Sequence, residues 1–162
     1  VIDWYSRKVL SWRIFNSIDS SFCVEALEEA LITYGRPEIF KTDQGSQFSS
    51  TAFTSLLRKW EIDISMDGRS RYFDNIFIER LWRSVKYRYV YLNLPETGSE
   101  LQRGLITYFR GYNQRWHQSL ERKSPNESYQ QFSCLTNKKQ KRKIYDDSNS
   151  VLKTPYIGSI SV

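Results

Sequence analysis

The sequence predicts a mixed α/β domain in which short strands are interspersed with helices. Short β-rich segments occur at residues 1–4, 8–15, 38–42 and 62–65. Between and after them, apolar side chains recur at three- and four-residue intervals, as they do along helices that pack on a core. The 162 residues, 40% of them hydrophobic, are enough for one domain with its own core. Such an alternation of strands and helices is typical of layered α/β folds.

The first two β-rich segments are predicted to form a hairpin. Residues 1–4 are apolar, residues 5–7 are polar enough to turn, and two sets of side chains alternate along residues 8–15. A polar break over residues 16–21 follows. The chain has no initiator Met and begins with residues that already resemble a strand, so we expect it to be a fragment of a longer protein.

A helix and a strand are predicted next. The apolar side chains of residues 22–34 follow the helical spacing, and Gly35 stands where a helix C-cap is expected. Residues 38–42 then form a strand that ends at Asp43. This aspartate therefore lies just past the carboxyl end of a strand, which is where α/β sheets bind their ligands.

Four further elements complete the predicted domain. A helix capped by Ser50 or Thr51 precedes the short strand at residues 62–65. Two longer helices follow, at residues 74–89 and 99–113.

The character of the sequence changes near its end. From residue 133 onward a run of lysine and arginine is followed by a polar segment rich in aspartate and serine. We therefore expect a core domain at residues 1–132 and a basic, flexible tail at residues 133–162.

The composition is that of a basic, aromatic-rich protein. The formal net charge is +6, and aromatic residues make up 15% of the chain. This composition is compatible with nucleic acid as a partner, although a basic protein without such a partner fits it about as well. No apolar run approaches the ~18 residues that would span a bilayer. Cys23 and Cys134 match no metal or redox spacing, so we expect reduced thiols in a cytoplasmic protein.

Two carboxylates stand out by their context. Asp43 follows a strand, whereas Glu79 lies on the first of the two longer helices. Four polar side chains share one face of that helix, because their positions are four and seven apart: Asn75, Glu79, Arg83 and Lys86. Such a stripe can hold a metal ion through its carboxylate and phosphates through its cations. The same residues also fit a second interpretation, in which Glu79 belongs to an ordinary solvated face and Asp43 to a turn.

The segments around these carboxylates resemble motifs of insertion-sequence transposases that have a retroviral-integrase-type catalytic core of the DDE family. Residues 42–48 (TDQGSQF) resemble the family's second-carboxylate motif, and residues 74–86 (DNIFIERLWRSVK) resemble its third-carboxylate helix. Thirty-five residues separate Asp43 from Glu79, which is the spacing that this family shows. Two more segments resemble the family's second and third strands and the region that closes its domain: residues 3–12 and 112–125.

The resemblance implies a fold and a reaction. The fold is the ribonuclease-H-like integrase core, a mixed sheet flanked by helices. In that family three carboxylates hold two divalent ions, Mg²⁺ or Mn²⁺, roughly 4 Å apart. The reaction is phosphoryl transfer on DNA, in which transposon ends are cleaved and then joined to a target.

The resemblance also assigns roles to residues of this chain. Asp43 and Glu79 would be catalytic metal ligands. Lys86 would contact DNA near the reacting phosphate, Arg83 is a weaker candidate for the same contact, and Asn75 would position Glu79 or touch DNA. The implied partners are transposon and target DNA and further copies of the enzyme, with neither a membrane nor a small-molecule substrate. The implied location is the bacterial cytoplasm, at the nucleoid.

Asp3 resembles a member of the catalytic triad, but we predict that it is not catalytic. It matches a position on the family's second strand, so its expected role is in the hairpin turn, with Arg7 as a possible partner. The first catalytic carboxylate would then lie upstream of Val1, together with the first strand. That strand is central in the family's sheet order 3-2-1-4-5, and without it the neighbouring edges expose unpaired backbone groups. We therefore expect this chain alone to be inactive and poorly stable.

Three alternatives remain open at this point. The chain could be a noncatalytic DNA-binding or subunit-interacting remnant, or an inert pseudogene product. A plain nuclease of the same fold is the third alternative, which the grouped transposase motifs disfavour. The only histidine, His117, could contact DNA, although a surface or packing role is favoured for it.

Overall fold

The structure is a computed structural model that describes residues 1–15, 21–42, 45–66 and 76–137. Its elements, in chain order, are α1 (Ser21–Tyr34), β1 (Ile39–Thr42), α2 (Thr51–Lys59), β2 (Asp63–Met66), α3 (Ile76–Val85), the π-helix η2 (Lys86–Val90), α4 (Tyr91–Asn93), α5 (Gly98–Gln114), the 3₁₀-helix η3 (Gln118–Leu120) and α6 (Pro125–Asn137).

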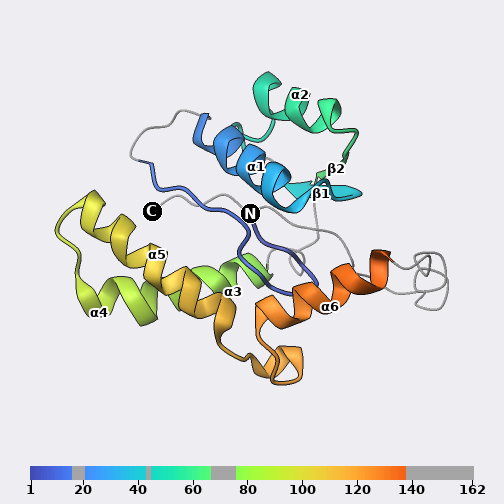
Figure 1. Ribbon diagram of the computed structural model, residues 1–162. Helices are drawn as coiled ribbons and strands as arrows, with labels where there is room; N and C mark the ends of the chain where they lie inside the picture. Colours follow the sequence, from blue (N-terminus) through green and yellow to red (C-terminus); the bar gives the residue numbers. More distant parts are fainter. Residues whose placement is uncertain (16–20, 43–44, 67–75, 138–162) are drawn as a thin grey trace.

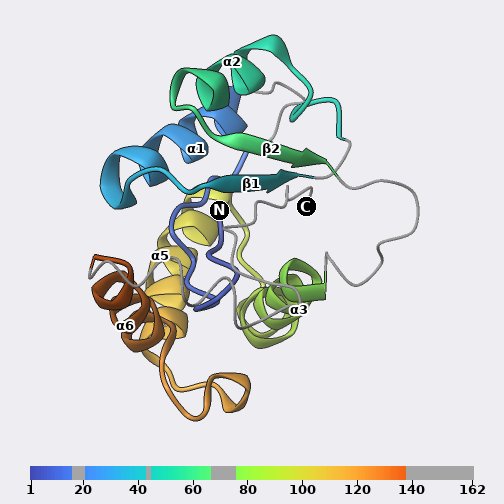
Figure 2. The same cartoon turned by 90° about the vertical axis from the view of Figure 1, so that its right-hand side faces the viewer.

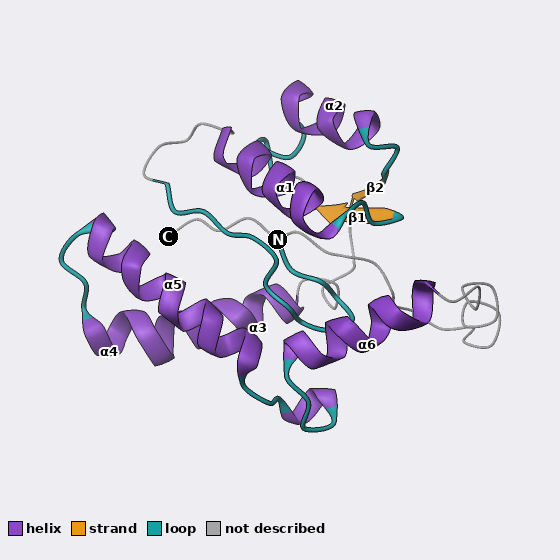
Figure 3. Ribbon diagram, viewed as in Figure 1, coloured by secondary structure: helices purple, strands orange, loops and turns teal. Residues whose placement is uncertain are grey.

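Helices cover a small central layer from two sides. The N-terminal hairpin and the β1–β2 sheet lie between α1 and α2 on one side and α3 and α5 on the other (Figures 1 and 2). β1 and β2 are parallel, paired from Ile39 with Asp63 to Thr42 with Met66. Helices account for most of the described chain (Figure 3). None of the described helices is long and apolar enough to cross a membrane.

The predicted hairpin is confirmed in its first part. Ile2 and Val9 form an antiparallel bridge, flanked by hydrogen bonds from Asp3 N–H to the Lys8 carbonyl (2.8 Å) and from Leu10 N–H to the Val1 carbonyl (2.9 Å). The expectation that the second strand reaches residue 15 is wrong, because no regular pairing continues past this bridge in residues 11–15.

The two edges of the hairpin differ in their hydrogen-bond partners. The N–H and C=O groups of Ile2 and Val9 point outward, because the two residues form a non-hydrogen-bonded pair. At Val9 the Asn113 side chain of α5 replaces a neighbouring strand: its Nδ2 donates to the Val9 carbonyl (2.8 Å) and its Oδ1 accepts from the Val9 N–H (2.9 Å). At Ile2, which is 2% exposed, no described residue supplies such bonds.

Two hydrophobic clusters form the core. One joins the hairpin to α3 and α5, and its buried members include Trp4, Leu81 and Phe109. The other joins α1, β1 and α2 around Leu27 and Phe53. The Ser11 hydroxyl donates a hydrogen bond to the Ala26 carbonyl of α1 (2.5 Å). The segment that follows the hairpin therefore packs beside this helix.

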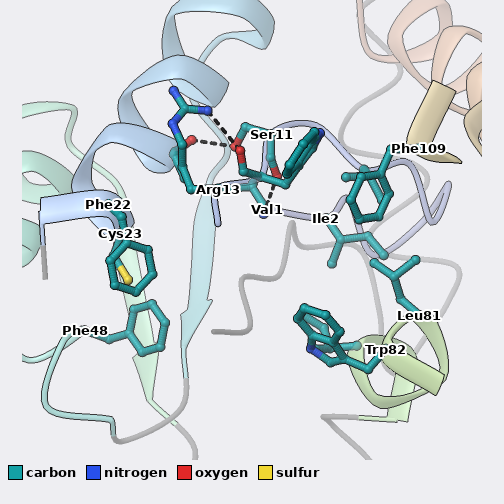
Figure 4. A pocket seen from close by; sticks show the side chains of 14 residues that line it. Val1, Ile2, Ser11, Arg13, Phe22, Cys23, Phe48, Leu81, Trp82 and Phe109 are labelled. Carbon is teal, nitrogen blue, oxygen red and sulfur yellow. Dashed lines mark hydrogen bonds between the residues drawn. The ribbon is translucent and has the colours of Figure 1, made fainter. Parts of the chain in front are cut away.

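An apolar pocket of about 50 Å³ lies where the two clusters meet. Ile2 and Leu81 line it from one side and Cys23 and Phe48 from the other (Figure 4). Ile2, whose backbone receives no hydrogen bond from a described residue, is among its lining residues.

Most helix predictions are confirmed, with differences at the ends. α1 and α2 match, with Gly35 in the left-handed region (φ 82°) and the Ser50 hydroxyl accepting from the Phe53 N–H. The predicted helix over residues 74–89 instead continues through η2 and α4 to Asn93, and residues 74 and 75 lie outside the described chain.

The helix α6 was not predicted. Ser124 and Glu127 form a capping box, in which the Ser124 N–H donates to the Glu127 carboxylate (2.7 Å) and the Glu127 N–H donates to Ser124 Oγ (3.2 Å). Pro125 occupies the first helical position, where its missing N–H costs nothing. The helix reaches Asn137, so it extends into the predicted tail, and the tail prediction stays open for residues 138–162.

Candidate metal and nucleic-acid site

The carboxyl end of β1 leads to one of the predicted metal ligands. Lys41 is buried there, with its Nζ 5.2 Å from the centre of the Trp4 indole. Thr42 is fully buried, and its hydroxyl has no hydrogen-bond partner in the described part of the chain. Asp43 follows directly and lies outside the described residues, so its placement stays a prediction.

The helix α3 carries the other predicted ligand. Its buried side contains Ile78 and Leu81, and the predicted stripe of Glu79, Arg83 and Lys86 is exposed to solvent. We call these three residues the carboxylate face. Asn75, the fourth predicted member, lies outside the described residues. In Figure 2 the tips of β1 and β2 point toward the side of the molecule on which α3 lies.

Glu79 is available for a ligand. Although Arg83 is four residues away, no ion pair within the described ranges joins Glu79 to a cation. The Arg83 guanidinium lies 5.8 Å from the centre of the Tyr87 ring instead. A carboxylate without a cationic partner offers the hard oxygen donors that Mg²⁺ and Mn²⁺ prefer.

The described residues alone do not complete a metal site. Among them, no group of three or more His, Cys, Asp or Glu side chains is placed to hold an ion. Glu79 fits the donor chemistry of a divalent cation, and Asp43 is outside the range that can be tested. The described part of the chain therefore supplies one suitable ligand.

Asp3 is engaged within the hairpin turn. It is 6% exposed, and its Oδ2 accepts hydrogen bonds from the Ser6 N–H (2.8 Å) and the Ser6 hydroxyl (2.5 Å). Arg7, the expected partner, donates to the Trp4 carbonyl and stacks over Phe77, with its guanidinium carbon 3.1 Å from the ring centre. These contacts give Asp3 a structural role in the turn, through Ser6 rather than through an ion pair with Arg7.

A second polar face of α3 borders a pocket that the sequence did not reveal. The pocket has a volume of about 390 Å³ and lies between the hairpin turn, α3, η2 and the segment after α5. We call it the arginine pocket, because four guanidinium groups line it: Arg7, Arg80, Arg83 and Arg88. No carboxylate is among its lining residues in the part of the chain that the structure describes.

The segment after α5 forms one wall of the arginine pocket. The His117 ring packs edge-on against Tyr112, with ring centres 4.7 Å apart, and its Nε2 lies 3.3 Å from the Tyr112 carbonyl oxygen. His117 also bridges to Lys123, which closes the turn. Burial lowers the pKa of the His117 imidazole, and the cations Arg115 and Arg88 lower it further. His117 therefore has the packing role that the sequence analysis favours, and it also lines a cationic pocket.

Comparison with known proteins shows similarity to integrase cores and transposases. Two sequence models, each described as integrase core domain, match residues 1–71 and 61–125. The transposase for insertion sequence element IS904 of Lactococcus lactis subsp. lactis is 28% identical over 130 residues, which cover 78% of this chain and 51% of that protein. The transposase for IS629 of Shigella sonnei is 26% identical over 117 residues, which cover 71% of this chain and 39% of that protein. Residues 1–125 thus match models of the integrase core domain, and the chain is similar to insertion-sequence transposases.

A solved structure confirms the predicted fold class. The catalytic core domain of HTLV-2 integrase, determined in complex with magnesium, superposes with a TM-score of 0.60 at 22% identity, covering 78% of this chain and 79% of that one. The chain therefore has the ribonuclease-H-like integrase fold, with a described sheet of two parallel strands. It spans about half or less of the length of the two transposases.

Proposed function

We propose that this chain is part of a transposase core that cleaves and joins DNA strands by metal-dependent phosphoryl transfer. The observation that carries the proposal is the carboxylate face: Glu79 is exposed and has no ion pair within the described residues, and the exposed Arg83 of α3 and Lys86 of η2 follow four and seven residues later. The match to the integrase core domain supports the reaction class, and the magnesium in the HTLV-2 core supports a divalent ion.

In this proposal the carboxylate of this face binds metal ions and its cations bind phosphate groups. Bound Mg²⁺ or Mn²⁺ ions would activate the attacking hydroxyl and stabilise the leaving oxygen. Glu79 and Asp43 would hold the ions at the end of β1. Lys86 would bind the phosphate beside the reacting bond, with Arg83 supporting it, since phosphate neutralisation positions a strand without reading its sequence. Asn75 would orient Glu79 or contact the strand.

The proposed site needs a third carboxylate from outside the described residues. Asp3 is held by Ser6 in the hairpin turn, which argues against a catalytic role for it. The Ile2 backbone receives no hydrogen bond from a described residue and adjoins an apolar pocket, which supports an extended segment at this place that would supply a further carboxylate and pair with the hairpin. Without that segment we expect the 162-residue chain to be inactive and poorly stable.

Manganese titration tests the ligand role of Glu79 on the chain itself. In NMR spectra of the chain, Mn²⁺ should broaden the amide signals of α3 around Glu79. Glu79→Gln should remove this broadening, because it replaces the anionic ligand with a neutral amide of the same shape. Glu96→Gln is the matched control, since Glu96 is exposed outside the carboxylate face. Equal broadening in both variants would contradict the proposal.

A strand-transfer assay tests the need for the missing segment. The purified chain is incubated with transposon-end DNA and Mg²⁺, and joined products are separated on a denaturing gel. We expect none, whereas robust joining by this chain would show that its own residues complete the site.

A second candidate function is a noncatalytic DNA-binding product that pairs with intact transposase subunits. The arginine pocket favours it, because its cations need no metal ion to bind a polyanion. Two results together would favour this candidate. DNA binding would fall steeply with salt and not depend on Mg²⁺, and Mn²⁺ would broaden the spectra of the wild type and of Glu79→Gln equally. An inert product would instead lack a cooperative melting transition in circular dichroism.

A further inference from the structure

The arginine pocket concentrates positive charge at one place on the molecule. Three of its four arginines lie on α3 and on η2, which follows directly, and Arg7 comes from the distant hairpin turn. In the described part of the chain, no carboxylate is among the lining residues. Like charges gathered in this way repel one another, and an anion bound among them would relieve the repulsion.

The electrostatics around the pocket agree with this geometry. Burial lowers the pKa of Arg7 to about 10, Tyr112 and the Asp3 carboxylate oppose this lowering, and the nearby Arg80 cation adds to it. At the opposite wall, burial and the cations Arg115 and Arg88 lower the pKa of His117. An anion in the pocket would oppose both effects, since it favours the charged forms of its neighbours.

The shape and the remaining lining residues favour a phosphodiester over a carboxylate. Guanidinium groups make paired hydrogen bonds to phosphate oxygens, and the exposed Ser119 offers a further hydroxyl donor along the wall. A volume of about 390 Å³ accommodates a phosphate together with its sugar. Tyr87 lines the pocket beside Arg83 and packs edge-on against Tyr91, and because it is 62% exposed the rest of its ring surface can contact a sugar or a base.

The pocket is distinct from the carboxylate face and adjacent to it. Arg80 follows Glu79 directly in α3, and successive residues of an α-helix point about 100° apart, since a turn contains 3.6 residues. Arg83 belongs to both surfaces. One DNA strand could therefore pass from the carboxylate face around α3 into the pocket.

We propose that the arginine pocket binds a phosphodiester group of a DNA strand, at a site separate from the metal ligands. The choice of DNA among polyanions rests on the proposed function. The site holds the strand several ångströms away from the reacting phosphate and needs no divalent ion. It therefore raises the affinity for DNA and directs the bound strand, and it takes no part in the reaction.

The first test compares two double variants of equal charge. Arg80→Gln with Arg88→Gln removes two cations from the pocket, and Arg103→Gln with Arg110→Gln removes two exposed cations from α5 outside it. Fluorescence anisotropy with a labelled DNA duplex in EDTA gives the affinity at several salt concentrations. We expect the pocket variant to bind at least about tenfold more weakly, with a salt slope smaller by up to about two. Equal losses in both variants would overturn the proposal.

The single histidine provides a second, local readout. Because His117 is the only histidine and lines the pocket, its imidazole proton signals report the pocket without assignment of the whole spectrum. DNA in EDTA should shift these signals in the wild type and in Glu79→Gln, but not in the Arg80→Gln, Arg88→Gln variant. Inorganic phosphate should shift them only at far higher concentration. Phosphate that binds as tightly as DNA would mark a small-anion site and contradict the proposal.

These tests separate the pocket from the proposed function. If Glu79→Gln leaves manganese broadening unchanged while the pocket variant loses DNA affinity, the metal site fails and the pocket stands. If Glu79→Gln removes the broadening while the pocket variant binds DNA like the wild type, the pocket fails and the metal site stands.

Discussion

The two polar faces of α3 differ in what surrounds them. The carboxylate face, with Glu79 and Lys86, is open to solvent and no described element covers it. The arginine pocket, which begins one residue further around the helix at Arg80, is bordered by the hairpin turn and by the segment after α5. The solvent-exposed face of this helix is thus suited to bind a metal ion and the reacting DNA strand. The face that borders the pocket is suited to bind a phosphate that takes no part in the reaction.

Cationic side chains have different roles on the two faces. Exposed cations such as Lys86 are screened by water and salt, so they steer a strand and bind it weakly. Of the pocket's four arginines only Arg7 is partly buried, and Arg80, Arg83 and Arg88 are exposed, so the pocket attracts an anion through the number of cations it brings together. The carboxylate face therefore depends on bound metal for its function, whereas the arginine pocket depends on the grouping of its cations.

Among single substitutions that spare Glu79, removal of Lys86 should weaken DNA binding the most. Lys86→Gln deletes a charged phosphate contact, so DNA affinity in Mg²⁺ should fall by about tenfold. Lys59→Gln, at the exposed end of α2, is the control and should change the affinity by less than about twofold. Anisotropy measures both. If the His117 signals of Lys86→Gln no longer respond to DNA, the two faces are not separate sites.

A change at Asn113 should loosen the pocket walls and leave the carboxylate face intact. Asn113→Ala removes both hydrogen bonds to the buried Val9 backbone, so the free energy of unfolding should fall by about 2 kcal/mol. The neighbouring exposed amide gives the control Gln114→Ala, which should change it by less than about 0.5 kcal/mol. Urea denaturation measures both, and equal stability would contradict the clamp between the hairpin and α5.

The smallest expected effect is a pH dependence of DNA binding through His117. In the free chain its pKa lies below 6.5, because of burial and of Arg115 and Arg88, while Tyr112 packs on its other side. A bound phosphate raises that pKa, so binding takes up protons and tightens as the pH falls between the free and the bound value. The gain from about pH 7.5 to 5.5 should be severalfold. His117→Gln should abolish it, and an unchanged pH dependence in that variant would assign the effect elsewhere.

Local sequence patterns were sufficient for the elements but not for the pocket. α1 and α2 followed from apolar spacing and from Gly35 and Ser50 at their ends, because these signals act within one segment. The second hairpin strand is shorter than its alternating pattern predicts: the Val1 amine still donates to the Ser11 carbonyl (2.8 Å), and no regular pairing follows in residues 12–15. The capping box at the start of α6, formed by Ser124 and Glu127, is a local signal that the sequence does contain.

The candidate site was predictable only in part. The exposure of Glu79, Arg83 and Lys86 on one face followed from helical periodicity, and the structure agrees with it. Asp43 and Asn75 lie outside the described residues, so their roles stay predictions. The arginine pocket had no sequence signature, because tertiary packing brings three distant segments together to form it.

The central claim is that α3 carries two independent sites, and one experiment tests it most directly. NMR spectra of the chain with DNA and Mn²⁺ would follow two signals at once, the broadening around Glu79 and the DNA-induced shift of His117. We predict that Glu79→Gln loses only the broadening and that Arg80→Gln with Arg88→Gln loses only the shift. Loss of both signals in either variant, or of neither in both, would contradict the claim.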